Sequence, residues 1–244
     1  MINIIIVSKA FDDNVINTIN SIKKQKFTNW KLIIKLKELS NEREIKINHD
    51  LEKCQIIVEQ DFGIYEAMNQ AIDGVSTGFL LFLNAGDIFN APDSLGVAIK
   101  LIEMSELERP EIKIHYFNWI RRGHGKSETV SPAIKPLKFN HQAVIYKSEL
   151  HTRFGNYMNL NNMLISDYLF FKNLQSNKVH SKIHNHTLSV INIEEGQSGK
   201  SIQFAQKLAI DFLCGEIGRI YFCILVILHP IYYSVKKIKA SCTN

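Results

Sequence analysis

The sequence predicts an α/β fold in which a mostly parallel sheet is flanked by helices. Runs of apolar and β-branched residues recur through the first ninety residues, as expected of strands that are buried on both faces of a parallel sheet. Between these runs lie segments whose apolar residues repeat at helical spacing. An alternation of strand, helix and strand at this pace produces a parallel sheet covered by helices on both faces.

Residues 1–90 contain four predicted strands and two predicted helices. The strands are Ile2–Ser8, Trp30–Leu36, Gln55–Gln60 and Phe79–Asn84. The first helix carries an apolar stripe that comprises Val15, Ile16, Ile19 and Ile22. Asp12 or Asp13 can cap this helix. The second helix is expected at about Ile64–Asp73.

Residues 91–200 follow a less regular pattern. The predicted elements are a helix from about Pro92, a strand at Ile112–Ile120, a polar hairpin at 121–132, a short strand within 139–150, a helix at Ser166–Ser176 capped by Ser166 or Asp167, and a closing strand at His186–Ile193. We therefore expect one domain over residues 1–200, in two halves that meet near residue 90, and a separate tail over residues 201–244.

The tail is predicted to be helical and amphipathic. Its unbroken apolar stretch, Ile220–Leu228, is shorter than the roughly 20 residues that span a bilayer, and Pro230 would kink the helix. The aromatic and basic residues that suit a membrane interface are Tyr221, Tyr232, Tyr233, Lys236, Lys237 and Lys239. We expect residues 217–239 to rest on a membrane surface. The alternative is a helix that packs on the core or on a second subunit.

The composition is that of an ordinary globular protein, with 45% hydrophobic and 22% charged residues. The net charge of +5 suits an anionic ligand or an anionic membrane surface, whereas no basic run interleaved with aromatic residues supports nucleic-acid binding. The four cysteines form no C-x-x-C pair, which favours a reducing compartment. Because the apolar start has no basic leader, we expect a cytoplasmic protein.

Two aspartates follow predicted strands directly. Asp61 stands just beyond Gln55–Gln60, and Asp87 stands just beyond Phe79–Asn84. The carboxyl ends of parallel strands meet at one edge of a sheet, where ligands collect. We therefore expect both carboxylates at the same rim.

The segment from Asp61 to Asp87 resembles the inverting family 2 glycosyltransferases with a GT-A fold. It reads DFGIYEAMNQAIDGVSTGFLLFLNAGD, and the branch that builds bacterial capsule, colanic-acid and O-antigen polysaccharides carries a similar D-x-G-I-Y-D-A-M-N … L-N-x-G-D pattern. The segments FNHQAVIY and ISDYLFF match the same family more loosely, so that the likeness covers most of the chain. Relatives also carry an acidic loop after the second strand, whose aspartate touches the nucleotide base. Here the sequence is KLIIKLKELSNERE, in which Glu38 is a candidate substitute.

The resemblance implies a nucleotide-sugar-binding half at residues 1–90 and an acceptor-side half at 91–200. It implies that Asp87 binds a Mn²⁺ or Mg²⁺ ion at the diphosphate, and that Asp167 is the base that deprotonates the acceptor hydroxyl. The implied nucleotide-sugar-binding residues are Asp61, Gly63, Asn69, Asn84 and His141. The implied reaction is inverting hexosyl transfer to a lipid-linked saccharide for a surface polysaccharide, at the inner face of the cell membrane.

Ordinary structural roles compete with these assignments. Asp87 also suits a turn or a helix cap, Asp167 suits an N-cap, and Asn69 suits an exposed helix position. His141 could orient the acceptor or the diphosphate, or it could cap a turn. Tyr65 is expected to be a packing residue.

Other enzyme classes fit the sequence less well. A nucleotidyltransferase carries a basic, glycine-rich loop after its first strand, and a dehydrogenase carries G-x-G-x-x-G there, whereas this sequence has VSKAFDDN. A glycoside hydrolase needs a pair of facing carboxylates, which the sequence does not announce. The remaining alternative is a non-catalytic homologue that binds a nucleotide sugar or acts as an assembly partner.

Overall fold

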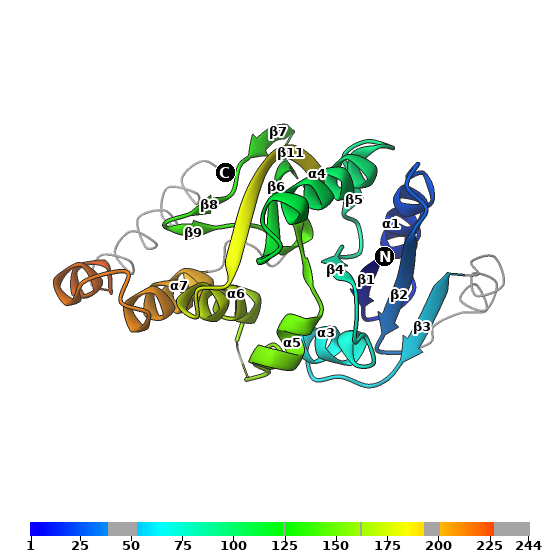
Figure 1. Ribbon diagram of the computed structural model, residues 1–244. Helices are drawn as coiled ribbons and strands as arrows, with labels where there is room; N and C mark the ends of the chain where they lie inside the picture. Colours follow the sequence, from blue (N-terminus) through cyan, green and yellow to red (C-terminus); the bar gives the residue numbers. More distant parts are fainter. Residues whose placement is uncertain (39–52, 124, 162, 193–200, 227–244) are drawn as a thin grey trace.

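A computed structural model describes residues 1–38, 53–123, 125–161, 163–192 and 201–226 (Figure 1). Within these residues the main sheet has nine strands in the order β3-β2-β1-β4-β10-β6-β11-β5, with β7 paired to β6. Its strands are β1 Ile2–Ser8, β2 Trp30–Leu36, β3 Cys54–Val58, β4 Phe79–Phe82, β5 Ile88–Phe89, β6 Ile112–Gly123, β7 Lys126–Val130, β10 Val144–Lys147 and β11 His180–Asn192. A separate hairpin comprises β8 Ala133–Ile134 and β9 Leu137–Lys138. The helices are α1 Asp13–Lys23, α3 Ile64–Ile72, α4 Ser94–Glu108, the short η1 His141–Ala143, α5 Glu149–Phe154, α6 Ser166–Ser176 and α7 Ser201–Leu213.

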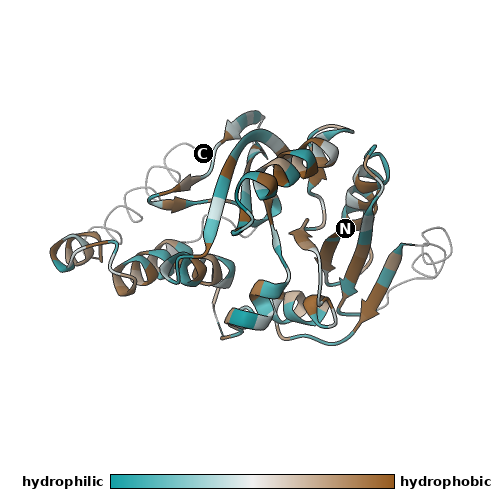
Figure 2. Ribbon diagram, in the orientation of Figure 1, coloured by the Kyte–Doolittle hydropathy of each residue, from teal (hydrophilic) through white to brown (hydrophobic). Residues whose placement is uncertain are grey.

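The parallel half of the sheet confirms the prediction from the apolar runs. β3, β2, β1 and β4 are parallel neighbours, and Ile4 is aligned with Leu32 on one side and with Leu81 on the other. Hydrophobic residues run along these strands (Figure 2). α1 and α4 pack into the core on one face, whereas α3, α5 and α6 pack into the core on the other. The structure is therefore the predicted α/β fold with helices on both faces.

The antiparallel strands bring distant segments to the edge where the parallel strands end. β10 is antiparallel to β4 and to β6, so the start of β10 lies beside the end of β4. β11 is parallel to β6, so its end reaches the same edge. Segments near residues 84, 141 and 192 can therefore meet, although they are far apart in the chain.

The predicted N-cap is correct for α1 and wrong for α6. Asp12 is the N-cap of α1, and its carboxylate accepts a hydrogen bond from the Val15 N–H at 3.0 Å. The expectation that Ser166 or Asp167 caps α6 is wrong, because Ile165 is the N-cap and makes no side-chain cap bond. Asp167 lies within the first turn of α6, and its carboxylate bonds to other elements.

The tail begins with α7, which packs beside α6 at the opposite end of the molecule from β3 (Figure 1). Leu208 and Ile210 of α7 are buried, and Ile210 belongs to the same core cluster as α6. No helix of the described residues is long and apolar enough to cross a membrane. Residues 193–200, where the predicted boundary falls, and residues 227–244, which include Pro230, lie outside the described residues.

An ionic network joins α7 to α6. Lys172 of α6 is buried, and it pairs with Glu216 and, at 3.9 Å, with Asp211. Asp211 also binds Lys207 at 2.7 Å and accepts a hydrogen bond from the Tyr168 hydroxyl. Buried charges are stable only when they are paired and hydrogen-bonded, so this network fixes where α7 lies.

Asp211→Asn should lower the free energy of unfolding by about 2 kcal/mol, because Tyr168 and Lys207 lose a charged acceptor, while buried Lys172 keeps its pair with Glu216. Urea denaturation at neutral pH measures the change. Glu128→Gln is the control, since it breaks an exposed pair with Arg121 and should cost less than about 0.5 kcal/mol. Equal losses in the two variants would contradict the prediction.

Candidate active site

The candidate site lies at the carboxyl edge of the parallel strands. Asn84 and Asp87 follow β4, and Asp61 follows β3. His141 stands in η1, directly before the antiparallel strand β10 that lies beside β4. Asp167 comes from the first turn of α6. The candidate site is therefore formed by the residues that follow β3 and β4, by η1 and by the start of α6.

Asp167 is held by a hydrogen bond on each carboxylate oxygen. Its Oδ1 accepts from the Tyr65 hydroxyl at 2.8 Å, and its Oδ2 lies 3.0 Å from Nδ1 of His141. Burial raises the pKa of Asp167, but the hydrogen bond and charge of His141 and the Tyr65 hydroxyl outweigh burial and hold the pKa below its usual value. Asp167 is thus a fixed and charged carboxylate at neutral pH.

His141 connects the two halves of the site. Its Nδ1 faces Asp167, and its Nε2 lies 3.5 Å from Oδ1 of Asn84. Its ring also meets Phe82 of β4 edge-on, with the ring centroids 6.4 Å apart. When the ring is protonated, both nitrogens donate, one toward each oxygen. His141 therefore lies between the end of β4 and the start of α6.

Asp87 is buried at the same edge, with 4% of its surface exposed. The N–H of Asn192, at the end of β11, donates to its Oδ1 at 3.2 Å, and the Thr18 hydroxyl donates to its main-chain carbonyl at 2.8 Å. Burial raises the pKa of Asp87 to about 7, while the Asn192 N–H, the charge of His141 and the amide of Gln142 act in the opposite direction. A cation at this carboxylate would favour its charged form.

The residues around Asp87 fit a divalent cation that is coordinated mainly by a bound substrate. The Oε1 atom of Gln142 is buried and has no partner among the described residues, and the Gln142 side chain reaches Asp87. Carboxylate and amide oxygens suit Mg²⁺ or Mn²⁺. Within the described residues no three His, Cys, Asp or Glu side chains gather as a metal site. A cation at Asp87 would therefore need further coordinating oxygens, such as those of a diphosphate.

Asp61 is buried beside a lysine that the sequence reasoning missed. Its Oδ2 lies 3.0 Å from Nζ of Lys35, and its Oδ1 accepts from the Gly63 N–H at 3.2 Å. Lys35 is fully buried and also donates to the carbonyls of Leu36 and Glu59. The signal was a lysine within the apolar run WKLIIKL, since a buried lysine needs a carboxylate partner.

Gly63 leaves the backbone open next to Asp61. Its φ is +154°, and an added Cβ would meet no protein atom within 4 Å. A ligand can therefore approach the main chain closely at this point.

Asn69 holds two segments of the protein together. Its amide nitrogen donates to the Tyr157 carbonyl at 2.9 Å, and its amide oxygen accepts from the Tyr157 N–H at 3.0 Å. This pair of bonds uses both ends of the side chain, and it joins α3 to the segment that precedes α6. The predicted contact of Asn69 with a nucleotide sugar stays a prediction.

Tyr65 is a buried packing residue, as expected, and its hydroxyl also reaches Asp167. Tyr65 lies one helical turn before Asn69, so both side chains leave the same face of α3. The signal in the sequence was weak, because a tyrosine on an apolar helix face also suits a core position. Only the position of α6 identifies its partner.

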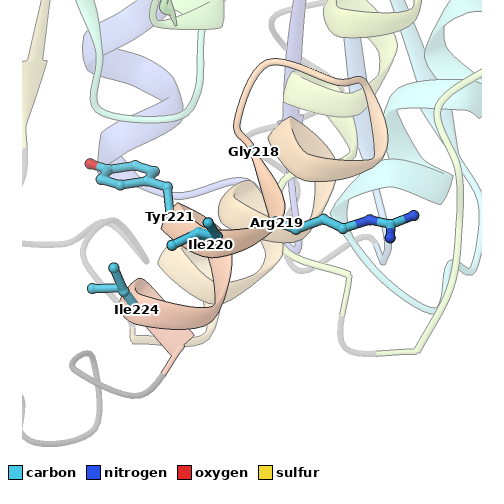
Figure 3. A pocket seen from close by; sticks show the side chains of 5 residues that line it. All are labelled: Gly218, Arg219, Ile220, Tyr221 and Ile224. Carbon is cyan, nitrogen blue, oxygen red and sulfur yellow. The ribbon is translucent and has the colours of Figure 1, made fainter.

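The helical segment after α7 exposes apolar side chains. Gly218, Arg219, Ile220, Tyr221 and Ile224 line an open depression (Figure 3). Ile220, Tyr221 and Ile224 lie on one side, whereas the Arg219 side chain points away from them. Ile220 is 80% exposed. This part of the predicted tail thus presents apolar surface to the outside.

Comparison with known proteins shows the fold of this chain. No family model and no curated protein matches the sequence. Solved structures of S. aureus TarS 1–349 with UDP and with UDP-GlcNAc are similar, each with 13% identity over 87% of this chain and with TM-scores of 0.66 and 0.67. The mannosyltransferase PcManGT from Pyrobaculum calidifontis, in complex with GDP-Man and Mn²⁺, is 14% identical over 89% of this chain, with a TM-score of 0.64. The chain spans only 64–65% of these structures. The likeness establishes the mixed α/β fold of the GT-A glycosyltransferases.

Asp87→Asn should change how stability depends on pH in the metal-free protein. Because burial raises the folded-state pKa of Asp87 to about 7, the parent protein loses stability as pH rises from about 4 to about 7. The loss is roughly 4 kcal/mol, at about 1.4 kcal/mol for each pH unit. Asp87→Asn avoids this loss, so it should be the more stable protein above pH 7 and about equal to the parent below pH 4.

Denaturation in EDTA at several pH values measures this difference. Asp73→Asn, which removes an exposed carboxylate, is the matched control and should differ from the parent by less than about 0.5 kcal/mol throughout. A difference between Asp87→Asn and the parent that does not change with pH would refute the raised pKa.

Proposed function

We propose that the protein is a glycosyltransferase of family 2 type that moves a hexose from a nucleoside-diphosphate sugar to a saccharide acceptor. The observation that carries this proposal is the arrangement of two carboxylates at the edge of a GT-A sheet. Asp167 is charged and fixed, Asp87 is buried where β4 ends, and His141 bonds to Asp167 on one side and to Asn84 on the other. Sugar transfer needs one group for the leaving diphosphate and another for the proton of the acceptor.

On the donor side, Asp87 would hold a Mn²⁺ or Mg²⁺ ion through its carboxylate. A cation of this kind neutralises the charge that grows on the leaving diphosphate. His141 and Asn84 lie close enough to this rim to bind the donor. The complexes of the similar structures, with UDP-GlcNAc in one and with GDP-Man and Mn²⁺ in another, support the same class of donor for this chain.

On the acceptor side, Asp167 would accept the proton of the attacking hydroxyl. The acceptor O–H bond breaks, its oxygen forms the new bond to the anomeric carbon, and the bond from that carbon to the diphosphate oxygen breaks. The proton moves to Asp167. A positioned carboxylate contributes about 10²–10⁴ in rate. Attack from the face opposite the diphosphate inverts the anomeric centre.

We also propose that the acceptor is lipid-linked and that the protein rests on the cytoplasmic face of the membrane. The exposed apolar side chains of Ile220, Tyr221 and Ile224 support this proposal, since apolar and aromatic groups partition into a membrane interface. The ionic network between α6 and α7 would then keep the membrane contact at a fixed place relative to Asp167. A lipid-linked saccharide would serve the synthesis of a surface polysaccharide.

A second candidate function is nucleotide-sugar binding without turnover, as in an assembly partner. The observation that favours it is Lys35, which stands where the acidic loop of relatives begins. All three Nζ protons of Lys35 point to oxygens of this chain, at Leu36, Glu59 and Asp61. A buried cation therefore stands near the end of β2, and Glu38, the candidate for the base contact, is exposed just after this strand.

Asp87→Ala and Asp167→Asn should each abolish most transfer, by about 10²-fold or more, through different steps. Turnover of nucleotide sugars with Mn²⁺ and a lipid-linked saccharide measures transfer, and calorimetry measures nucleoside-diphosphate binding. Asp87→Ala should weaken the metal-dependent binding, whereas Asp167→Asn should leave it unchanged. Full activity in both variants would reject the site, and metal-dependent binding without transfer to any acceptor would favour the second candidate.

Ile220→Glu should reduce binding to vesicles that contain anionic phospholipid by about tenfold, because a buried apolar side chain contributes about 1.5–3 kcal/mol. Co-sedimentation with the vesicles measures bound protein. Leu107→Glu is the control, because Leu107 of α4 is 86% exposed and lies outside the tail. Unchanged sedimentation of Ile220→Glu, or an equal loss in the control, would count against the membrane surface.

A further inference from the structure

The hydroxyl of Tyr65 has one proton and two acceptors within reach. Its oxygen lies 2.8 Å from Oδ1 of Asp167 and 3.0 Å from the main-chain carbonyl of Leu164. A phenol has a single O–H donor, so it can satisfy only one of these acceptors at a time. The choice between them depends on which acceptor is stronger.

The rest of the molecule holds this hydroxyl in place. Tyr65 is 7% exposed, and its ring packs against the ring of Tyr157 at 5.9 Å. One turn further along α3, Asn69 binds the Tyr157 main chain in both directions. Tyr65 thus bonds from α3 to Asp167 in the first turn of α6, a helix whose N-cap residue makes no side-chain hydrogen bond.

We propose that Tyr65 is a positioning residue for the proton-accepting carboxylate, and that its hydroxyl proton moves between Asp167 and Leu164 as Asp167 gains the acceptor's proton. This inference rests on the proposed function. While Asp167 is charged, the hydroxyl donates to Oδ1, since charge-assisted hydrogen bonds are the stronger ones. Once Asp167 is neutral, the hydroxyl rotates to the Leu164 carbonyl. In both states the Tyr65 hydroxyl has an acceptor, and a proton on Oδ1 of Asp167 can be donated in a hydrogen bond to the phenol oxygen.

The hydrogen bond from Tyr65 acts mainly on the charge state of Asp167. The titratable groups that face this carboxylate are the phenols of Tyr65, Tyr146 and Tyr157 and the imidazole of His141. Of these, Tyr65 and His141 hydrogen-bond to it, and both lower the pKa of Asp167 against the effect of burial. The Tyr65 bond therefore keeps the carboxylate unprotonated and orients it before the acceptor arrives.

Tyr65→Phe tests this role, because it removes the hydroxyl and keeps the packed ring. The turnover number should fall about tenfold at neutral pH, with the KM for the donor unchanged. The acid limb of the pH profile should move to higher pH, because the charged form of Asp167 loses a donor. The Asp167 carboxyl carbon, followed by ¹³C NMR against pH, should show the same upward shift without any assay of activity.

Tyr157→Phe is the matched control. Its hydroxyl bonds to Tyr146 at 2.7 Å within the same aromatic cluster, and no hydrogen bond joins it to Asp167 among the described residues. This variant should change stability and leave the pH profile and the carboxyl titration in place. An upward shift in Tyr65→Phe alone supports the inference, whereas no shift, or an equal shift in both variants, overturns it.

The failure of this inference differs from the failure of the proposed function. Full transfer activity in Asp167→Asn would remove the base itself. An inactive Asp167→Asn together with an unshifted Tyr65→Phe would remove only the role of Tyr65.

Discussion

The carboxylates of Asp87 and Asp167 lie largely out of water, and the rest of the site is arranged to supply them with hydrogen-bond donors. A charge away from water is costly unless donors surround it. Asp167 receives its donors from α3 and η1, and Asp87 receives one from the end of β11. Each donor comes from a different element. Satisfying the two carboxylates therefore also decides how the two halves of the chain meet.

Helix α3 carries much of this assembly through two residues one turn apart. Tyr65 reaches the start of α6, and Asn69 binds the main chain of Tyr157. On its other side, α6 is joined to α7 by Lys172 and Asp211. A continuous series of polar contacts thus runs from α3 through Asp167 and the rest of α6 to α7. In the proposed enzyme, this series would keep the acceptor-binding side and the membrane-binding side in one fixed arrangement.

The pKa shifts at the two carboxylates have opposite directions and fit different roles. Burial dominates at Asp87 and raises its pKa to about 7, so a cation is the natural partner of its charged form. Hydrogen bonds dominate at Asp167 and lower its pKa, so it stays charged without a cation. In the proposed enzyme, two carboxylates with pKa values shifted in opposite directions would serve two different steps, the release of the diphosphate and the uptake of the acceptor's proton.

Local patterns in the sequence determined the elements of the parallel half and the rim that carries Asp61 and Asp87. Residues Ile2–Ser8 and Trp30–Leu36 form strands with the predicted bounds, because a run buried on both faces needs only its own apolar residues to be recognised. The partners of Tyr65, Lys35 and Asp167 were decided by the tertiary structure alone. Apart from the bond of Lys35 to the Leu36 carbonyl, each of their side-chain hydrogen bonds joins residues that are 24 or more positions apart in the sequence. Such a hydrogen bond depends on how two distant elements pack against each other, and the local periodicity of a sequence does not predict that packing.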